Sequence, residues 1–355
     1  MKKSPLLALA LAGAIALSVA GCSEDAPSST TSEAPKFKAC IVSDTGGFDD
    51  RSFNQISYAG VLKAQTDFGI EINKVQSAQD ADYATNIQSM IDADCSIVIA
   101  AGYLLSDSIK TAAAANPDVY FAIVDDPAEG GTANLRGLTF QTNEPGFLAG
   151  YLAAGLTKTG TVATFSGMEI PSVTIFMDGY AQGVEYYNTV KGTNVKVIGW
   201  DRAAKTGTSA DNFGDAAGGK TIADTQVSQG ADILFPVAGG TGNGALQSAQ
   251  ENSDKVVGAI WVDTDGYVTA SEYGAIIITS VEKAVDVAVY EAIKAAYENK
   301  WVADPFVGTL ANKGVKLSDY HDFDAKIPAG LKTEITDLSA KIASGEIKVK
   351  EVGEA

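Results

Sequence analysis

The amino-acid sequence predicts an α/β protein made of two doubly wound parallel-sheet lobes. Short apolar segments rich in β-branched residues alternate with longer amphipathic segments from residue 38 onward, and this alternation is typical of parallel sheets with helices on both faces. A chain of 355 residues is too long for one small domain and best fits two domains of ordinary size. Because 46% of the residues are hydrophobic, each domain can bury a core.

Ten strands and eight helices are expected in chain order. The expected strands are residues 39–43, 72–75, 97–100, 120–124, 135–139, 161–165, 195–198, 233–237, 256–261 and 275–279. The helices expected between most of them are residues 52–68, 83–93, 106–116, 144–156, 176–187, 220–229, 245–252 and 281–298. Five strands precede Pro145 and about four fall in the stretch after it, which predicts two similar lobes.

The two lobes are expected to meet at a short hinge near residues 141–145, since no stretch between them resembles a long linker. A short crossing suits rotation about a hinge. We expect the first lobe to comprise residues 37–141 plus about 275–303, and the second to comprise residues 142–274 plus about 304–352. The last strand and helix would then cross back to the first lobe.

The N-terminal segment has the features of an export signal. Two lysines precede an apolar run over residues 6–20, and small residues precede Cys22. The run is shorter than the ~20 residues that span a bilayer, so residues 1–21 are expected to be removed. The pattern resembles the lipobox of bacterial lipoproteins, in which acyl chains on the cysteine would hold the protein at a membrane; a cleaved secretory signal is the alternative. Residues 22–36 predict a flexible tether.

The composition excludes several classes of function. The chain has 26 basic and 44 acidic residues, and its formal charge of -18 argues against nucleic acid as a partner. It contains one histidine, His321, and three cysteines. A catalytic triad, a histidine-rich metal site and a cysteine-based zinc site therefore lack the residues they need. We expect no enzymatic activity, no cofactor and no bound metal.

Two cysteines, Cys40 and Cys95, remain after the leader is removed. Both lie near the start of strands that are expected to be neighbours in a sheet. Outside the cytoplasm such a pair can oxidise, so the sequence allows either a disulfide or two buried thiols.

Polar loops follow several of the expected strands. Because ligands bind beyond the carboxyl ends of strands in open parallel sheets, these loops are candidates for a binding site. The candidates are Asp44, Asp50 and Asn54 after the first strand, Gly102 after the third, Asp125 after the fourth, Gly239 and Gly240 after the eighth, Asp263 and Asp265 after the ninth, and Lys283 after the tenth. Taken singly, each has a simpler explanation, such as a helix cap at Asp50 or Ser52, a tight glycine turn, or an exposed charge.

Aromatic residues lie in or beside the same loops. They are Phe48, Phe53, Tyr103, Phe176 and Phe213. Phe48 is the best stacking candidate because its glycine and aspartate neighbours make burial difficult, whereas the others can also be core residues. Stacking of a planar ligand contributes about 1–3 kcal/mol per contact, by analogy with base recognition, and carboxylates accept hydroxyl hydrogens. The combination predicts a neutral nucleoside or sugar rather than a nucleotide, because several carboxylates would repel a phosphate.

The glycine-rich loop at residues 239–244 permits a rival hypothesis, a dinucleotide-dependent enzyme. Gly242 and Gly244 begin such a fingerprint, but Gln247 stands where the third glycine is required. Serine-based hydrolysis would need His321 as its base, and that residue lies in a polar C-terminal segment. An enzyme is therefore the least favoured hypothesis.

Five short motifs occur in order along the chain. They are Asp44-x-Gly46, Asp50-x-Ser52-Phe53-Asn54, Ala238-Gly239-Gly240-Thr241-Gly242-x-Gly244, Val262-Asp263-x-Asp265 and Thr279-Ser280-Val281-x-Lys283. Together they resemble the basic membrane protein family of bacterial lipoproteins, which are substrate-binding components of ABC transporters for purine and other nucleosides. The likeness runs from Lys38 to about Val352. Ile175, where members often have arginine, and Tyr103, where phenylalanine is commoner, depart from the family pattern.

The resemblance implies a type I periplasmic-binding-protein fold, in which two lobes joined by three crossings close on a ligand. It also implies a role for each matching residue. The implied contacts are Asp44 and Asn54 at the base edge, Phe48 and Phe213 on the two faces of the ring, Asp125, Asp263 and Lys283 at the ribose hydroxyls, and Gly239 and Gly240 where the backbone approaches the ligand.

The protein is accordingly expected to bind without chemistry. It would be a lipid-anchored extracytoplasmic protein that captures a nucleoside between two lobes and delivers it to an ABC permease. Among nucleosides, a purine nucleoside is the favoured ligand. Ligand contacts to both lobes would have to stabilise closure, because a ligand that touches one lobe shifts no equilibrium. The alternative is a ligand sensor or surface interaction lipoprotein with the same fold.

Overall fold

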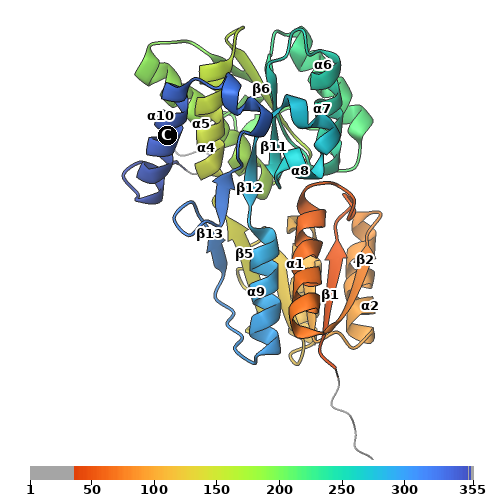
Figure 1. The fold of residues 1–355 in the computed structure, drawn as a ribbon. Helices are drawn as coiled ribbons and strands as arrows, with labels where there is room; N and C mark the ends of the chain where they lie inside the picture. The colour runs from red at the N-terminus through yellow and green to blue at the C-terminus, as the bar shows by residue number, and fades with distance from the viewer. Residues whose placement is uncertain (1–35, 351, 353–355) are drawn as a thin grey trace, which may run out of the picture. The chain divides into compact units, whose positions relative to one another are not determined.

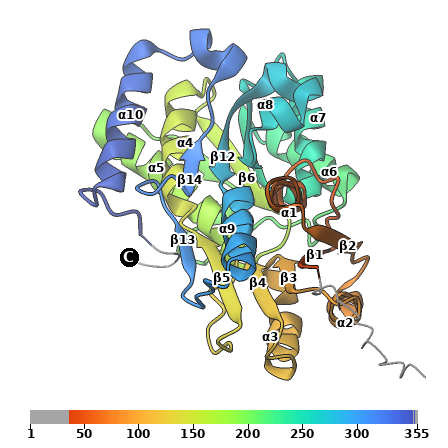
Figure 2. The ribbon, with the colours of Figure 1, turned by 60° about the horizontal axis from the view of Figure 1, so that its bottom comes forward.

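Two six-stranded sheets form the frame of the computed structural model, which describes residues 36–350 and 352. The first sheet has the strand order β13-β5-β4-β3-β1-β2, and the second has the order β14-β12-β11-β10-β6-β7. Every pairing in the first sheet is parallel, and among the described strands of the second only the β12–β14 pair is antiparallel. Helices cover both faces of each sheet (Figure 1 and Figure 2). The predicted α/β class with two doubly wound lobes is confirmed.

The first lobe is the part of the chain that packs around the first sheet. Its strands are β1 (Lys38–Ser43), β2 (Glu71–Gln76), β3 (Ile97–Ala101), β4 (Tyr120–Val124), β5 (Leu135–Phe140) and β13 (Phe306–Gly308). Its helices are α1 (Phe53–Phe68), α2 (Tyr83–Asp92), α3 (Ser106–Ala115) and α9 (Val285–Tyr297), with the short 3₁₀ turns η1 (Asp80–Asp82) and η2 (Tyr103–Leu105). Helices α1 and α9 pack on one face of the sheet and α2 and α3 on the other.

The second lobe packs around the second sheet. Its strands are β6 (Thr161–Ser166), β7 (Lys196–Ile198), β10 (Ile233–Val237), β11 (Gly258–Asp263), β12 (Ile277–Lys283) and β14 (Val315–Leu317), with a separate hairpin of β8 (Trp200–Asp201) and β9 (Thr206–Gly207). Its helices are α4 (Asn143–Leu156), α5 (Pro171–Lys191), α6 (Ala216–Ser228), α7 (Gly242–Glu251), α8 (Gly266–Thr269) and α10 (Ala329–Ala343), with the 3₁₀ turns η3 (Gly239–Thr241), η4 (Ser271–Ile276) and η5 (His321–Lys326). Helices α4, α5 and α10 share one core, and α6 and α7 share the core on the opposite face.

The last strands lie in different sheets from those expected. The expectation that residues 275–303 return together to the first lobe is wrong for the strand, because β12 pairs with β11 in the second sheet. Conversely, β13 pairs with β5 in the first sheet, which corrects the expectation that residues from about 304 to 352 belong to the second lobe. Apolar alternation marks a segment as a strand, but it does not show which of two similar sheets the strand joins.

Three crossings connect the lobes, and they lie side by side. They follow β5, β12 and β13 in turn. The backbone N–H of Gln141 donates to the carbonyl of Gly308 at 2.8 Å, and that of Ala284 donates to Gly314 at 2.9 Å. The carboxylate of Glu144, at the start of α4, accepts from the N–H of Leu310 at 2.6 Å. These bonds couple the three crossings into one hinge.

Helices α4 and α5 approach so closely that glycine is required at their contact. A Cβ added to Gly150 of α4 would collide with the carbonyl oxygen of Tyr180, and one added to Gly183 of α5 would collide with that of Phe147. Backbone atoms at both points occupy the space of a side chain. The pair therefore fixes how the first helix after the hinge sits on the second lobe.

Gly150→Ala is expected to lower the free energy of unfolding by about 1–3 kcal/mol, the range for overpacking a filled core. The methyl group would force α4 and α5 apart. Urea denaturation followed by circular dichroism measures the change. Gly330→Ala is the control, because nothing lies within 4 Å of a Cβ at that helical position; equal stability of the two variants would contradict the close-contact explanation.

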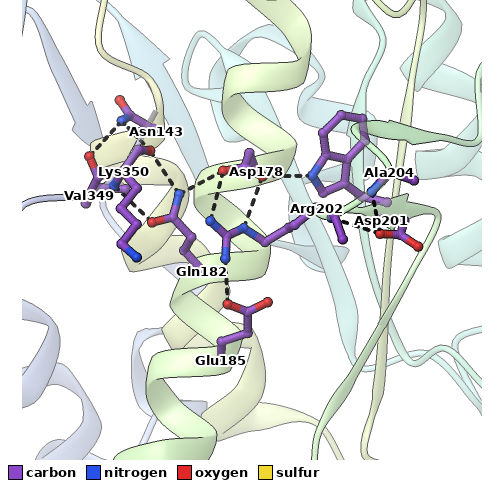
Figure 3. Close-up of polar contacts among 11 residues, drawn as sticks. Asn143, Asp178, Gln182, Glu185, Asp201, Arg202, Ala204, Val349 and Lys350 are labelled. Carbon is purple, nitrogen blue, oxygen red and sulfur yellow. Dashed lines mark hydrogen bonds and ion pairs between the residues drawn. The ribbon is translucent and has the colours of Figure 1, made fainter. Parts of the chain in front are cut away.

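A buried carboxylate on α5 organises the outer part of the second lobe (Figure 3). Asp178, with 1% of its surface exposed, accepts from Arg202 Nε at 3.0 Å and from Trp200 Nε1 at 3.2 Å. It also accepts from Gln182 Nε2 at 2.8 Å. Gln182 exchanges two further bonds with the main chain of Lys350, each 3.0 Å long. The buried charge is thereby satisfied, and the C-terminal segment is fastened to α5.

The two alternatives for the cysteine pair are resolved. Cys40 of β1 and Cys95, just before β3, form a disulfide with their Cα atoms 6.0 Å apart. The signal peptide, the tether and the lipidation candidate Cys22 lie outside the described residues. None of the described helices is long and apolar enough to cross a membrane.

Candidate functional site

A cavity lies where the strand ends of both sheets converge. The empty space between its lining residues is about 510 Å³, including the part open to solvent. The first lobe contributes the loop after β1, the turn η2 and the end of β4, and the second contributes the start of α5 and the ends of β10, β11 and β12. This position is the one that the rule for parallel sheets predicts.

Eleven of the fourteen predicted ligand-binding residues line this cavity. They are Asp44, Asp50, Phe53, Asn54, Gly102, Asp125, Phe176, Phe213, Gly239, Asp263 and Lys283. Strand order was enough to bring most of them together, because these follow or end a parallel strand or begin the next helix. The exceptions are Phe176, in the second turn of α5, and Phe213, in the loop between β9 and α6. The other three, Phe48, Gly240 and Asp265, are outside the set of lining residues.

Phe48 belongs to the core of the first lobe and does not reach the cavity. Phe48 is 7% exposed, and its ring centroid lies 5.4 Å from that of Tyr58 on α1. The ammonium of Lys74 lies 5.0 Å from the ring centroid. Gly47, with φ of 71°, lets the chain turn so that the next side chain points inward. The glycine that made burial look difficult is therefore what permits it.

Asp265 and Gly240 have structural positions beside the cavity. The carboxylate of Asp265 accepts from the backbone N–H of Tyr267 at 3.1 Å, as a cap on the short helix α8. Its other oxygen lies 2.7 Å from Nε2 of His321. A Cβ at Gly240 would lie 2.9 Å from the carbonyl oxygen of Phe213, so this glycine lets the Phe213 loop pack closely.

A buried lysine lies between two carboxylates at one end of the cavity. Nζ of Lys283 is 2.7 Å from Asp125 of the first lobe and 3.1 Å from Asp263 of the second. Burial disfavours the ammonium, but the two carboxylates outweigh burial and raise the pKa of Lys283. The same nitrogen lies 4.6 Å from the ring centroid of Phe53 and 5.3 Å from that of Phe176. Lys283 therefore holds the positive charge that several carboxylates facing one cleft require.

An amide between two acids lies at another part of the wall. Nδ2 of Asn54 donates to Asp44 at 2.8 Å and to Asp50 at 3.2 Å. Two carboxylate acceptors fix the orientation of the amide, because a flipped amide would bring oxygen against oxygen. Oδ1 of Asn54 is then buried with no hydrogen-bond partner among the residues that the structure describes.

The two acids beside Asn54 are costly to ionise. Burial raises the pKa of Asp44 to about 6 and that of Asp50 to about 7. An aspartate in an unfolded chain titrates near a pKa of about 3.9, so between about pH 4 and pH 7 the folded protein holds protons that the unfolded chain has released. Stability must therefore decrease as pH rises through this window.

We expect the free energy of unfolding of the ligand-free protein to be lower at pH 8 than at pH 5.5. The measurement is urea denaturation at a series of pH values. Asp44→Asn removes one of the two raised pKa values and should make the difference smaller. An unchanged pH profile in this variant would show that Asp44 titrates in the folded protein as it does in the unfolded chain.

Sequence reasoning missed several lining residues. They are Leu104, Ile170, Ser172, Val173, Val237, Ala238 and Val262. Val237 ends a predicted strand and Val262 directly follows the end of another, so their neighbourhood was identified without them. Helix α5 begins at Pro171, five residues before the expected start, and proline at the first helical position was the available signal.

One nucleotide-binding pattern in the sequence has no counterpart in the structure. Residues 214–221 read Gly-Asp-Ala-Ala-Gly-Gly-Lys-Thr, the spacing of a phosphate-binding loop. Lys220, however, lies within α6 and pairs with Asp224 at 2.8 Å and Glu251 at 2.9 Å. The carboxylate of Asp215 caps the helix and accepts a backbone N–H. A phosphate would meet negative charge there, so the pattern does not mark a nucleotide site.

Comparisons with known proteins agree with this architecture. The family model described as ABC transporter substrate-binding protein PnrA-like matches residues 37–352. The "CD4+ T-cell-stimulating antigen" of Listeria innocua is 31% identical over 97% of both chains. The "ABC transporter nucleoside-binding protein BmpA" of Lactococcus lactis is 31% identical over 98% of this chain and 94% of its own.

Solved structures of solute-binding proteins share the fold. A solute-binding protein of an ABC transporter system from Aeropyrum pernix superimposes with a TM-score of 0.80 and 25% identity, covering 88% of this chain and 92% of its own. The two lobes and three crossings are those of a type I periplasmic binding protein. The protein is thus a binding protein rather than an enzyme, and the chain belongs to the Bmp family of PnrA-like substrate-binding proteins of ABC transporters.

Proposed function

We propose that this protein captures a nucleoside in the cavity between its lobes and delivers it to an ABC permease. The observation that carries the proposal is the combination of phenylalanine rings, an acid–amide cluster and a carboxylate–lysine cluster around one cavity. Rings suit the faces of a base, and the two polar clusters suit its edge and the sugar. The name of the Lactococcus relative, a nucleoside-binding protein, supports the same ligand class.

Phe53, Phe176 and Phe213 would contact the base. The three rings come from both lobes, and all of them line the cavity. Stacking on an aromatic ring contributes about 1–3 kcal/mol per base. Phe48 is buried in the core of the first lobe and cannot stack on the ligand. Phe53 or Phe176 would therefore contact the face of the base opposite Phe213, the role that the family resemblance implied for Phe48.

Asp125, Asp263 and Lys283 would hold the sugar. Carboxylates form strong hydrogen bonds with hydroxyl donors, and ribose offers vicinal hydroxyls. The lysine is already neutralised by two carboxylates, so the site has no surplus positive charge for a phosphate. A nucleoside is therefore favoured over a nucleotide.

Asp44 and Asn54 would read the base edge, and they favour a purine with adjacent hydrogen donors. Oδ1 of Asn54 is an acceptor without a partner among the described residues, and Asp44 is an acceptor when ionised. The Watson–Crick edge of guanine presents two neighbouring N–H groups, whereas adenine and cytosine each pair a donor with an acceptor. We therefore propose guanosine as the preferred ligand.

Calorimetric titration tests the ligand class. The mature protein is titrated with guanosine, inosine, adenosine, uridine, cytidine, ribose, guanosine monophosphate and NAD. Binding of nucleosides with guanosine tightest, and no binding of ribose or NAD, is expected. Binding of NAD or of free sugars alone would refute the proposal.

We further propose that acyl chains on Cys22 anchor the protein outside the cell membrane. The motif before Cys22 supports this. Cys22→Ser should move the protein from the membrane fraction to the soluble fraction, and retention in the membrane fraction would count against the anchor. Loss of nucleoside uptake on deletion of the gene for this protein would distinguish transport from sensing.

A further inference from the structure

Ser52 occupies the N-cap position of α1, but its hydroxyl does not cap the helix. Asp50 does so instead: its carboxylate accepts from the backbone N–H groups of Ser52 at 3.0 Å, Asn54 at 2.8 Å and Gln55 at 3.1 Å. Serine is a favoured N-cap residue because its oxygen satisfies these donors. Here the serine hydroxyl is released for another partner.

That partner lies in the other lobe. Oγ of Ser52 is 2.6 Å from Oδ2 of Asp263 and 3.2 Å from the carbonyl oxygen of Val262. A hydroxyl has one hydrogen to donate, and the shorter distance indicates that Ser52 donates it to the carboxylate of Asp263 rather than to the carbonyl of Val262. Ser52 is 0% exposed and Asp263 is 6% exposed, so water does not compete well for this charge-assisted bond.

The residue before Ser52 strengthens the same contact. The carbonyl oxygen of Arg51 accepts from Thr264 at 3.0 Å and from the indole of Trp261 at 3.4 Å, and the guanidinium pairs with Glu272. All three partners belong to the second lobe. Arg51 has φ of 61°, a backbone conformation that favours glycine.

The Ser52 bond also closes a path between the lobes. Asp263 holds Lys283, and Lys283 holds Asp125 of the first lobe. The path thus runs from Ser52 of the first lobe to Asp263 and Lys283 of the second lobe, and returns to the first lobe at Asp125. Loss of the serine hydroxyl would leave one oxygen of Asp263 without its donor and free to turn toward Lys283 or away from the sugar.

We propose that residues 50–52 form a latch on the second lobe, in which Ser52 stabilises the closed form and positions Asp263. The inference rests on the proposed function, since a closed form matters only if the ligand binds between the lobes. Ser52 is not among the residues that line the cavity. The latch therefore changes the affinity for the ligand without contacting it, because it changes the population of the closed form.

Spin labels, one on each lobe, measure that population. Thr85 of α2 and Thr225 of α6 are exposed, and Thr85→Cys with Thr225→Cys provides the attachment points. In the ligand-free protein, Ser52→Ala is expected to lower the closed-to-open ratio tenfold to hundredfold, the worth of a hydrogen bond to a charged group. Dissociation constants for guanosine should rise in the same direction, by up to the same factor.

Matched variants separate a latch from general damage. Ser106→Ala removes a similar serine–aspartate hydrogen bond, 2.7 Å long to Asp126, that lies within the first lobe. This variant should change neither the closed-to-open ratio nor the dissociation constant for guanosine. Ser52→Thr keeps the hydroxyl and should keep both values close to those of the wild type. Arg51→Gly keeps the backbone conformation, removes only the exposed ion pair, and should shift the ratio less than about fivefold.

Two results would overturn the latch. Distance distributions and guanosine affinities of Ser52→Ala that match those of Ser106→Ala would show that the Ser52 bond does not govern closure. Thr264→Val removes the buried hydroxyl that donates to the carbonyl oxygen of Arg51 and should also lower the closed-to-open ratio. If Ser52→Ala fails to fold, an unchanged ratio in Thr264→Val would overturn the latch. Failure of the wild-type protein to bind any nucleoside would instead refute the proposed function. The distance measurement on the ligand-free protein would still show whether the Ser52 bond stabilises the closed form.

Discussion

Replacing Lys283 by methionine is expected to abolish detectable nucleoside binding and to lower the free energy of unfolding by about 3–5 kcal/mol. Methionine retains the length of the side chain between the phenylalanine rings but removes the ammonium. Asp125 and Asp263 would then face each other without a counter-charge in a buried site. Breaking a buried ion pair is costly because the remaining charges stay desolvated. Urea denaturation and calorimetric titration with guanosine measure the two effects.

Lys220→Met is the matched control for this prediction. Lys220 also lies between two carboxylates, but both are well exposed, with 43% and 50% of their side-chain surface accessible. Exposed pairs contribute about 0–1 kcal/mol, so this variant should unfold almost like the wild type. A similarly small loss in Lys283→Met would show that the carboxylates at the cavity are solvated or protonated.

A triple variant tests whether charge is the cause. Lys283→Met combined with Asp125→Asn and Asp263→Asn removes the lysine together with both of its partners. Replacing a whole buried ionic group is often nearly neutral for stability, so most of the lost unfolding free energy should return. Binding should not return, because the acceptors for the sugar hydroxyls are gone. Recovery of binding would contradict the proposed sugar contacts.

The meeting of these charges in one cavity could be predicted from the sequence, because it follows from topology. Asp125 and Lys283 are 158 positions apart, yet each ends a strand or follows one directly. In parallel sheets the carboxyl ends of the strands point the same way, so the residue that follows each strand is carried to the shared edge. The prediction needed only the positions of the strands, which the apolar segments supplied.

What failed depends on packing between distant segments. The placement of β12 in the second sheet follows from its pairing with β11, and both sheets offer similar apolar surroundings to such a strand. The burial of Phe48 depends on the turn at Gly47 and on the space beside Tyr58. A local pattern reports how polar a segment is, but not which partner in the fold fills its contacts.

The hydrogen bond of Ser52 lies beyond sequence reasoning for the same reason. Both Asp50 and Ser52 suited the N-cap of α1, and the sequence left the two alternatives equal. The choice is made by Asp263, which offers Ser52 a carboxylate acceptor from the other lobe, while Asp50 supplies the cap. Competition between a local and a distant partner is decided only in the folded protein.

Asp44→Asn is expected to weaken guanosine binding about tenfold to hundredfold at pH 8, while leaving the ligand-free protein at least as stable as the wild type. Hydrogen bonds to a charged group contribute about 1.5–3 kcal/mol, and the variant replaces a charged acceptor with a neutral amide. The amide oxygen can still accept from Gly46 and Asn54, as Oδ1 of Asp44 does. Because burial raises the pKa of Asp44 to about 6, the variant also avoids the cost of holding a buried negative charge at pH 8.

The opposite signs of the two effects distinguish a binding role from a structural one. A residue that only supports the fold would lose stability and affinity together when replaced, whereas a residue kept for its ligand gains stability as it loses affinity. Lowering the pH to 5 protonates Asp44 in the free wild-type protein, so its guanosine affinity should fall toward that of Asp44→Asn, whose own affinity changes less. Asp107→Asn, at an exposed position on α3, should reproduce the wild-type affinity at both pH values. Equal affinities of the wild type and Asp44→Asn at pH 8 would remove Asp44 from the base contact and, with it, the reason to prefer guanosine.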